Sequence, residues 1–263
     1  NKGLLLAGFG SFWWGFFGVL YFKYITFIGY IELVIHRCLW TTLTLILTTF
    51  FFSKWDIFFK IIKSKQNLIY LFISGFLIFI NWGVWIYAIA TNRIIDASFG
   101  YFIMPILSVL LGYIFFKEKL NNKRIFSITL VILSILYLIF VSLKSLPWVG
   151  LIVALSWGFY NLVRKKINVD TDIGLLIESL FILPIAIIVF YMIAAKGYND
   201  FSLSNPSMML IILLAGPMTV IPLFLYVRGV ELCGLGPSGM IFYITPTLQF
   251  LLGFFYYDEV FSF

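Results

Sequence analysis

The sequence predicts an all-α polytopic membrane protein built from two inverted repeats of five helices, and three observations support this fold class. The 263 residues are 62% hydrophobic and only 11% charged, whereas about a quarter of a soluble domain is charged. The apolar residues fall into nine long runs. The two halves of the chain also match each other at a common offset, which is typical of membrane folds with internal symmetry.

Nine apolar runs are each interpreted as a membrane-spanning helix, with a few residues of error at either end. A helix needs about 20 predominantly apolar residues to cross the bilayer core, and only helices and closed barrels satisfy their own backbone in lipid. A barrel would show short alternating segments, whereas the run from Ile125 to Phe140 is almost continuously apolar. The predicted spans are residues 4 to 22, 28 to 50, 68 to 90, 95 to 116, 125 to 142, 148 to 163, 173 to 194, 207 to 227 and 237 to 257.

Basic residues in the connections predict the orientation of the chain. Most of the 18 Lys and Arg residues lie in alternate connections, and the other side of the membrane holds only Lys23, Arg93, Lys144 and Lys196. Basic loops are retained in the cytoplasm, so we expect a multi-pass protein of the inner membrane with a cytoplasmic amino terminus. Because the basic residues form no single patch, the net charge of +7 predicts a lipid bilayer and no nucleic acid as partner.

The repeat aligns residues 97 to 118 with residues 238 to 259 at a shift of 141 residues. Within this segment Pro105 matches Pro246, Gly112 matches Gly253 and Glu118 matches Glu259. Similar shifts pair Trp14-Gly15-Phe16 with Trp157-Gly158-Phe159, Glu32 with Glu178 and Tyr87 with Tyr226. Matching Pro, Gly and Glu residues are harder to obtain by chance than matching leucines in apolar runs.

The repeat predicts two domains, residues 1–142 and residues 148–263. Each repeat unit has about five spans, and because five is odd the second unit enters the membrane from the opposite side. The second half contains only four predicted spans. We therefore expect a tenth helix, absent from this chain, that returns the carboxyl terminus to the cytoplasm.

A resemblance to a known family is carried by the segments IELVIHRCLW, ASFGYFIMPILSVLLG, YNLVRKKI, GLLIESLFILP and YITPTLQFLLGFFYYDE. They resemble the EamA family of the drug/metabolite transporter superfamily, and within it the RarD, or chloramphenicol-sensitivity, branch. The resemblance covers nearly the whole chain. It implies ten helices, alternating access, a small-molecule substrate and a central cavity lined mainly by helices 1, 3, 4, 6, 8 and 9. It does not identify the substrate.

Four ionisable side chains inside the spans are candidate coupling or gating groups, because charges in the membrane are unfavourable unless paired or hydrated. Glu32 and His36 are four residues apart and share a helix face, with Arg37 beside them. Glu178 matches Glu32, while Leu183 stands where Arg37 would be matched. The alternative is a structural ion pair among Glu32, His36 and Arg37, since helices 2 and 7 are peripheral in the family architecture.

Matched prolines are the strongest geometric indication of a binding site. Proline removes one hydrogen bond of a helix, so Pro105 and Pro246 are expected to release the carbonyls of Tyr101 and Phe242. Broken helices near the midplane are where transporter substrates bind, although a kink that only shapes packing is the alternative. The candidate cavity residues are Trp14, Asn81, Trp85, Tyr101, Pro105, Tyr160, Tyr226, Tyr243, Pro246 and Gln249. Such a cavity suits a neutral or zwitterionic, partly aromatic solute.

Other patterns predict structural roles or no site. Glu118 and Glu259 end matching spans, and we expect each to cap the next helix. The Gly234 to Gly239 segment fits G-x-G-x-x-G but follows no predicted strand, so a tight turn is expected and not a dinucleotide site. With one His and two distant Cys residues, a zinc site is unsupported. We expect no cofactor, no metal and no catalytic residue.

These observations predict a secondary transporter that exports a small organic metabolite or drug by alternating access, with proton coupling as a further hypothesis. Direction and coupling are implied only by the resemblance. Two other classes remain open. One is a passive channel, and the other is a membrane-embedded, lipid-acting enzyme in which His36 would be the general base. The sequence does not predict the oligomeric state.

Overall fold

A computed structural model describes residues 2–119, 122–137, 148–167, 169–197, 199, 201 and 206–259, and this part of the chain is helical with no strand. The helices of the first half are α1 (Lys2–Trp13), η1 (Trp14–Gly18), α2 (Val19–Tyr24), η2 (Thr26–Ile28), α3 (Tyr30–Phe51), α4 (Trp55–Ile62), α5 (Lys65–Ala90), α6 (Ile94–Phe116) and α7 (Asn122–Tyr137). Those of the second half are α8 (Trp148–Lys166), α9 (Thr171–Ala195), α10 (Pro206–Leu213), α11 (Ala215–Cys233), α12 (Leu235–Ile241) and α13 (Ile244–Phe255).

The predicted class, an all-α polytopic membrane protein, is confirmed. All nine predicted runs coincide with helices, and seven segments of the described chain are long and apolar enough to cross a membrane. The described parts of the other two predicted spans, residues 125 to 142 and 148 to 163, do not meet this criterion of length and hydropathy. Only 16 residues of α7 are described, and residues 138–142 of its run lie outside the described residues. In α8 the last turn is basic, with Arg164, Lys165 and Lys166.

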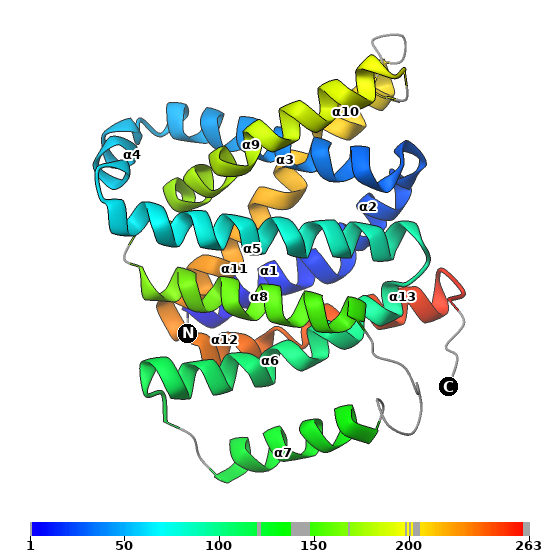
Figure 1. The fold of residues 1–263 in the computed structure, drawn as a ribbon. Helices are drawn as coiled ribbons and strands as arrows, with labels where there is room; N and C mark the ends of the chain where they lie inside the picture. The colour runs from blue at the N-terminus through cyan, green and yellow to red at the C-terminus, as the bar shows by residue number, and fades with distance from the viewer. Residues whose placement is uncertain are drawn as a thin grey trace.

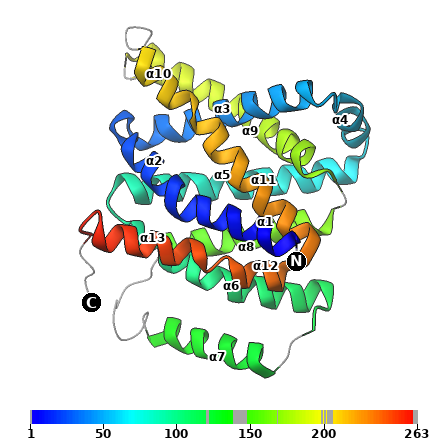
Figure 2. The same ribbon diagram turned by 180° about the vertical axis from the view of Figure 1, so that it is seen from behind.

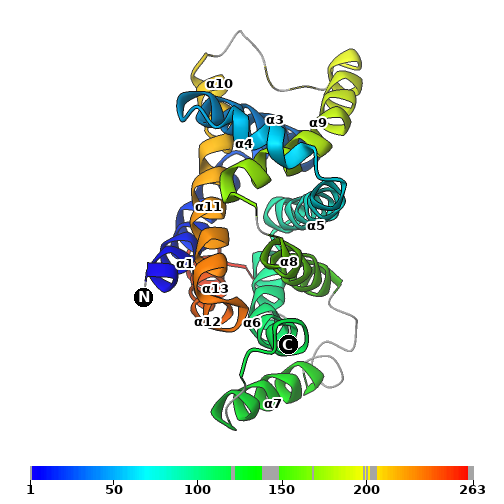
Figure 3. The ribbon, with the colours of Figure 1, turned by 90° about the vertical axis from the view of Figure 1, so that its left-hand side faces the viewer.

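The helices lie roughly side by side (Figure 1). Seen along their axes (Figure 3), α5, α8 and α6 form one row that faces a second row of α1, α11, α12 and α13. The view from behind (Figure 2) places α1, α11 and α13 on the near face. Helices α3 and α9 pack against each other at one end of the bundle, whereas α7 packs against α6 at the other. The two rows enclose the interior in which the candidate site lies.

Close approach of α6 to α8 depends on glycine. Gly100 and Gly150 face each other, and a Cβ atom built on Gly100 would overlap the backbone carbonyl of Gly150. Small residues of this kind let membrane helices pack backbone to backbone. The outer surface is apolar instead: Phe255 and Tyr191 are both 72% exposed. Such an exposed apolar belt fits a lipid environment.

The matched prolines behave differently in the two halves, which corrects one expectation. Helix α6 continues through Pro105, whereas its counterpart is broken between α12 and α13, and Pro246 lies in the first turn of α13. The expected free carbonyl of Phe242 is wrong, because that oxygen accepts a hydrogen bond of 2.9 Å from the backbone N–H of Thr245. The Phe242 carbonyl is therefore part of the turn that separates α12 from α13.

Candidate functional site

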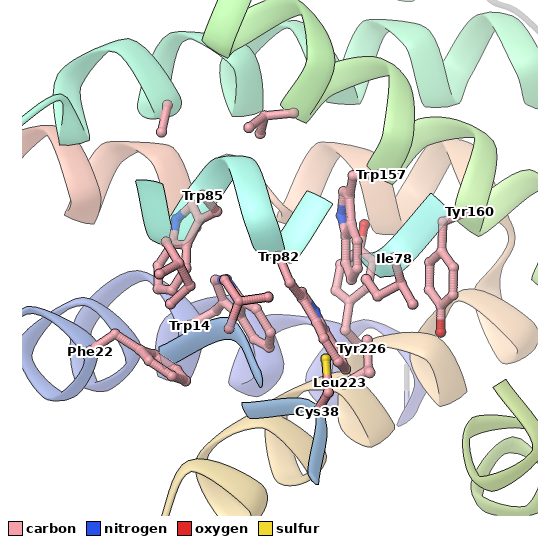
Figure 4. Close-up of a cluster of buried hydrophobic side chains, with 14 of the residues drawn as sticks. Trp14, Phe22, Cys38, Ile78, Trp82, Trp85, Trp157, Tyr160, Leu223 and Tyr226 are labelled. Carbon is pink, nitrogen blue, oxygen red and sulfur yellow. The ribbon is translucent and has the colours of Figure 1, made fainter. Parts of the chain in front are cut away.

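Aromatic side chains from six helical segments meet in the interior of the bundle (Figure 4). We call this group the central cluster, and its members are Trp14, Phe22, Trp82, Trp85, Tyr101, Trp157, Tyr160, Tyr226 and Phe242. The ring centroids of Trp157 and Tyr160 are 5.3 Å apart, and those of Trp157 and Tyr226 are 5.6 Å apart. The contributing segments are those numbered 1, 3, 4, 6, 8 and 9 among the predicted spans.

Trp14 and Trp157 hold matching positions in the two halves. Their rings are stacked, and the ring centroids are 6.3 Å apart. Trp14 belongs to η1, a single π-helical turn, and such turns inside membrane or soluble helices often mark functional sites. Gly15 lets this turn lie against α13, since a Cβ atom there would be 2.9 Å from the carbonyl oxygen of Thr245. The cluster therefore joins the two halves directly.

Asn81 connects three helices beside the cluster. Its Nδ2 donates to the carbonyl of Val153 and to Ser156 Oγ, both at 3.1 Å, and its Oδ1 accepts from the Tyr101 hydroxyl at 3.2 Å. The amide of Gln249 is also fully buried, yet neither its nitrogen nor its oxygen has a hydrogen-bond partner. A buried amide without partners is unfavourable, which distinguishes Gln249 from the fully bonded Asn81.

Arg37 extends from α3 into the central cluster and is 0% exposed. Its guanidinium carbon lies 4.6 Å from the ring centroids of Phe22 and Trp82, 4.9 Å from that of Trp14 and 5.3 Å from that of Trp85. Its Nε donates to Thr219 Oγ1 at 3.1 Å. Although α3 corresponds to a helix outside the implied cavity set, its arginine reaches the centre.

Glu32 and His36 form the pair that their spacing predicts, with 3.2 Å between Oε1 and Nε2, and both are buried. The histidine ring packs against Phe190 and Phe201, at centroid distances of 5.3 and 4.8 Å. Consecutive helical residues point about 100° apart, so Arg37 faces the cluster while this pair faces α9. The contact of Glu32 with His36 is therefore present, whereas Arg37 does not join it and bonds to Thr219 instead.

Glu178 lies at the edge of the central cluster and pairs with Arg164, the first of three basic residues that end α8. Its Oε1 accepts from Ser74 at 2.5 Å and lies 3.5 Å from Arg164 Nη1. Its Oε2 accepts from the Tyr160 hydroxyl at 3.2 Å. Arg164 is only 1% exposed and also lies 3.7 Å from Glu231. Because Lys165 and Lys166 follow it, Arg164 reads in the sequence as part of a basic loop and not as the partner of a buried carboxylate.

The interior space next to the cluster is small. An enclosed pocket between α3, α5, α9 and α11 is lined by Thr41, Trp82, Glu178 and Leu223 among others, and its size corresponds to about one water molecule. A larger hollow lies on the surface beside Trp13, Phe17 and Tyr257.

The predicted residues do not all converge. Trp14, Asn81, Trp85, Tyr101, Tyr160 and Tyr226 lie in or beside the cluster, as the ring and hydrogen-bond contacts above define it. Tyr243 is half-buried and packs its ring 6.1 Å from that of Phe102. Pro105 lies where Gly239 of α12 approaches α6, and Pro246 is buried at the start of α13. Sequence reasoning missed Trp82 and Phe22, which no motif marks, and Trp157, which the repeated Trp-Gly-Phe segment could have indicated.

Glu118 and Glu259 cap helices reciprocally. The Glu118 carboxylate accepts from the backbone N–H groups of Leu235 and Gly236, at 3.0 and 2.9 Å, where α12 begins. The Glu259 carboxylate accepts from those of Ile94 and Ile95, at 3.1 and 3.0 Å, where α6 begins. A capping role was expected, but each residue caps the matching helix of the other half and not the next helix in the chain. The inverted repeat stays a prediction, and this reciprocity supports it.

The same contact explains the G-x-G-x-x-G segment. The N–H groups that would cradle a phosphate in a dinucleotide site belong here to Leu235 and Gly236, and they already bind the Glu118 carboxylate. Within the described residues, no group of three or more His, Cys, Asp or Glu side chains could hold a metal ion. The centre presents ring faces, the Asn81 amide and the Arg37 cation.

Comparison with known proteins gives consistent results. Residues 1–140 match the model of the EamA-like transporter family. The chain is 33% identical to the "Uncharacterized transporter YojE" of Bacillus subtilis, over 100% of this chain and 88% of that protein. It is 33% identical to "Protein RarD" of Escherichia coli, over 98% and 87%. It is 23% identical to the "Chloramphenicol-sensitive protein RarD" of Pseudomonas aeruginosa, over 88% and 78%.

Proposed function

Because the chain belongs to the EamA-like transporter family, in its RarD branch, we propose that it is a secondary transporter of the inner membrane that exports small organic molecules. In this proposal residues 1–142 and 148–263 form two inverted repeats that move against each other, with the amino terminus in the cytoplasm. The placement of the basic residues supports that orientation. Alternating access then exposes one central site to either side of the membrane.

One observation carries the proposal: matching side chains of the two halves, Trp14 and Trp157, stack at the centre of a buried cluster to which both halves contribute. A site at the interface of two repeats changes its access when one repeat rocks against the other. The reciprocal carboxylate caps join a second matching pair of segments across the two halves, α6 with α12 and α13.

Glu178 is the proposed coupling group, and its contacts support it over the Glu32–His36 pair. Its carboxylate accepts a hydrogen bond from Tyr160, a member of the central cluster, and it lines the enclosed pocket together with Trp82. The Glu32–His36 pair packs instead against Phe190 and Phe201. A proton taken up at Glu178 would weaken its interaction with Arg164, which is 3.5 Å away, and so alter the centre.

Counterflow in proteoliposomes tests transport. Vesicles that contain the purified full-length protein are loaded with unlabelled amino acids, aromatic metabolites or chloramphenicol. Uptake of the same solute in labelled form is then followed. Saturable counterflow is expected for a carrier, whereas a passive channel would give flux without saturation or counterflow. Tyr101→Ala and Pro246→Leu proteins that fold should transport poorly, and full transport by both would contradict the central site.

A pH gradient imposed on the same vesicles tests coupling. The wild-type protein should accumulate substrate in response to the gradient, and Glu178→Gln should lose this response while it retains counterflow. Glu32→Gln is the matched control, because it neutralises a buried carboxylate of the counterpart position. Loss of the response in Glu32→Gln with a normal response in Glu178→Gln would refute the assignment.

A further inference from the structure

Arg37 is a cation whose hydrogen-bonding capacity is almost unused. A guanidinium has five N–H groups and cannot be deprotonated in a protein, and here only Nε has a partner, Thr219. Both terminal nitrogens, Nη1 and Nη2, are buried without a hydrogen-bond partner. Within the described residues, none of the ion pairs involves Arg37.

The surrounding rings stabilise the positive charge of Arg37, but they do not accept strong hydrogen bonds from its N–H groups. Each ring face attracts the cation electrostatically, and four ring centroids lie within 5.3 Å of the guanidinium carbon. Ring faces are weak hydrogen-bond acceptors. Arg164 shows the contrast in charge partners: two of its nitrogens are also buried without a hydrogen bond, but two carboxylates lie within 3.7 Å of it. Arg37 thus lacks the carboxylate partner that Arg164 has.

Indole N–H groups near Arg37 also lack a hydrogen-bond acceptor. The indole N–H groups of Trp82 and Trp85, two of the rings around Arg37, are buried without an acceptor, and so is that of Trp157. These groups and the arginine are all donors and accept no hydrogen bond. A solute that supplies acceptors only, with a negative charge and a flat apolar body, would satisfy them together.

We propose that the central site binds a small organic monoanion, with its carboxylate on Arg37 and its apolar or aromatic body between Trp14, Trp82 and Trp85. This inference rests on the proposed transport function and names its substrate class. It replaces the neutral or zwitterionic solute expected from the aromatic residues alone. Arg37, Trp82 and Trp85 are all at most 2% exposed, so binding requires separation of the two halves, as alternating access provides.

Paired probes that differ only in the acidic group test the proposal. Phenylacetate and phenylacetamide, and hexanoate and hexanamide, are titrated into the purified full-length protein by calorimetry and then used in counterflow. A charged hydrogen bond is worth enough to favour each carboxylate by about 10- to 100-fold. Arg37→Gln should abolish this preference. Lys23→Gln, which removes a positive charge outside the cluster, is the matched control and should keep it.

Several outcomes would overturn the inference. They are equal or tighter binding of the amides, binding of neither probe, and a preference that survives in Arg37→Gln. If Arg37→Gln does not fold, the wild-type comparison and Trp82→Phe, which removes one donor and keeps a ring, still decide. Counterflow of amides without carboxylates would refute the anion site and leave the transporter intact. Carboxylate binding that depends on Arg37, without counterflow of any solute, would refute transport and leave the anion site intact.

Discussion

Removal of the Glu259 carboxylate should destabilise the protein measurably. It is 8% exposed and accepts two hydrogen bonds, from the N–H groups of Ile94 and Ile95 at the start of α6. Each buried donor left without an acceptor costs about 1–3 kcal/mol, and the favourable charge at the helix start is also lost. We therefore expect Glu259→Ala to lower the free energy of unfolding by about 2–4 kcal/mol.

The equivalent substitution in the other half provides an internal comparison. Glu118 is half-buried and caps the shorter α12, so water replaces part of its contact and Glu118→Ala should cost about 1–2 kcal/mol. Reversible unfolding in mixed detergent micelles, followed by tryptophan fluorescence, measures both values. Asp258→Asn is the charge control: it removes the neighbouring exposed carboxylate and should change stability by less than about 0.5 kcal/mol. A Glu259→Ala protein as stable as Asp258→Asn would refute the capping argument.

Three further substitutions test the packing. Asn81→Leu should destabilise by about 1–3 kcal/mol, because the hydroxyl of Tyr101 and the groups on α8 lose their partner, and the same unfolding assay measures it. Gly100→Val should separate α6 from α8, since its Cβ overlaps the Gly150 carbonyl, and should lower the yield of folded protein in size-exclusion chromatography. Lys54→Ala breaks a 2.6 Å ion pair with Asp172 that is partly exposed, and should cost under about 1 kcal/mol and less at high salt, as melting at two ionic strengths would show.

Much of the fold is readable from the sequence because its signals are local or repeated. The length of an apolar run reports the thickness of the bilayer directly, so all nine runs coincide with helices. Glu118 and Glu259 were assigned a capping role because both recur at one offset. Their partners were not readable, since the sequence does not state which helix start lies beside a given carboxylate.

The candidate site was predicted in part. Trp14, Trp85 and Tyr101 lie in the central cluster, and they were predicted because they stand on helices that the family resemblance implies to line the cavity. Trp82 was missed because nothing in its local sequence distinguishes it from a lipid-facing tryptophan. The pairing of Glu178 with Arg164 was missed because Arg164 begins a basic run, which alone indicates topology.

The sequence by itself determined the membrane class, the number of apolar runs, the matched positions of the repeat and the pair of Glu32 with His36, since all of these depend on residues close in the chain or on residue type. Only the tertiary structure decided that Arg37 turns away from that pair, that four rings surround it and that its terminal nitrogens lack acceptors. The physical reason is that the direction of a side chain on a helix follows from its position, whereas its environment depends on how the other helices pack around it.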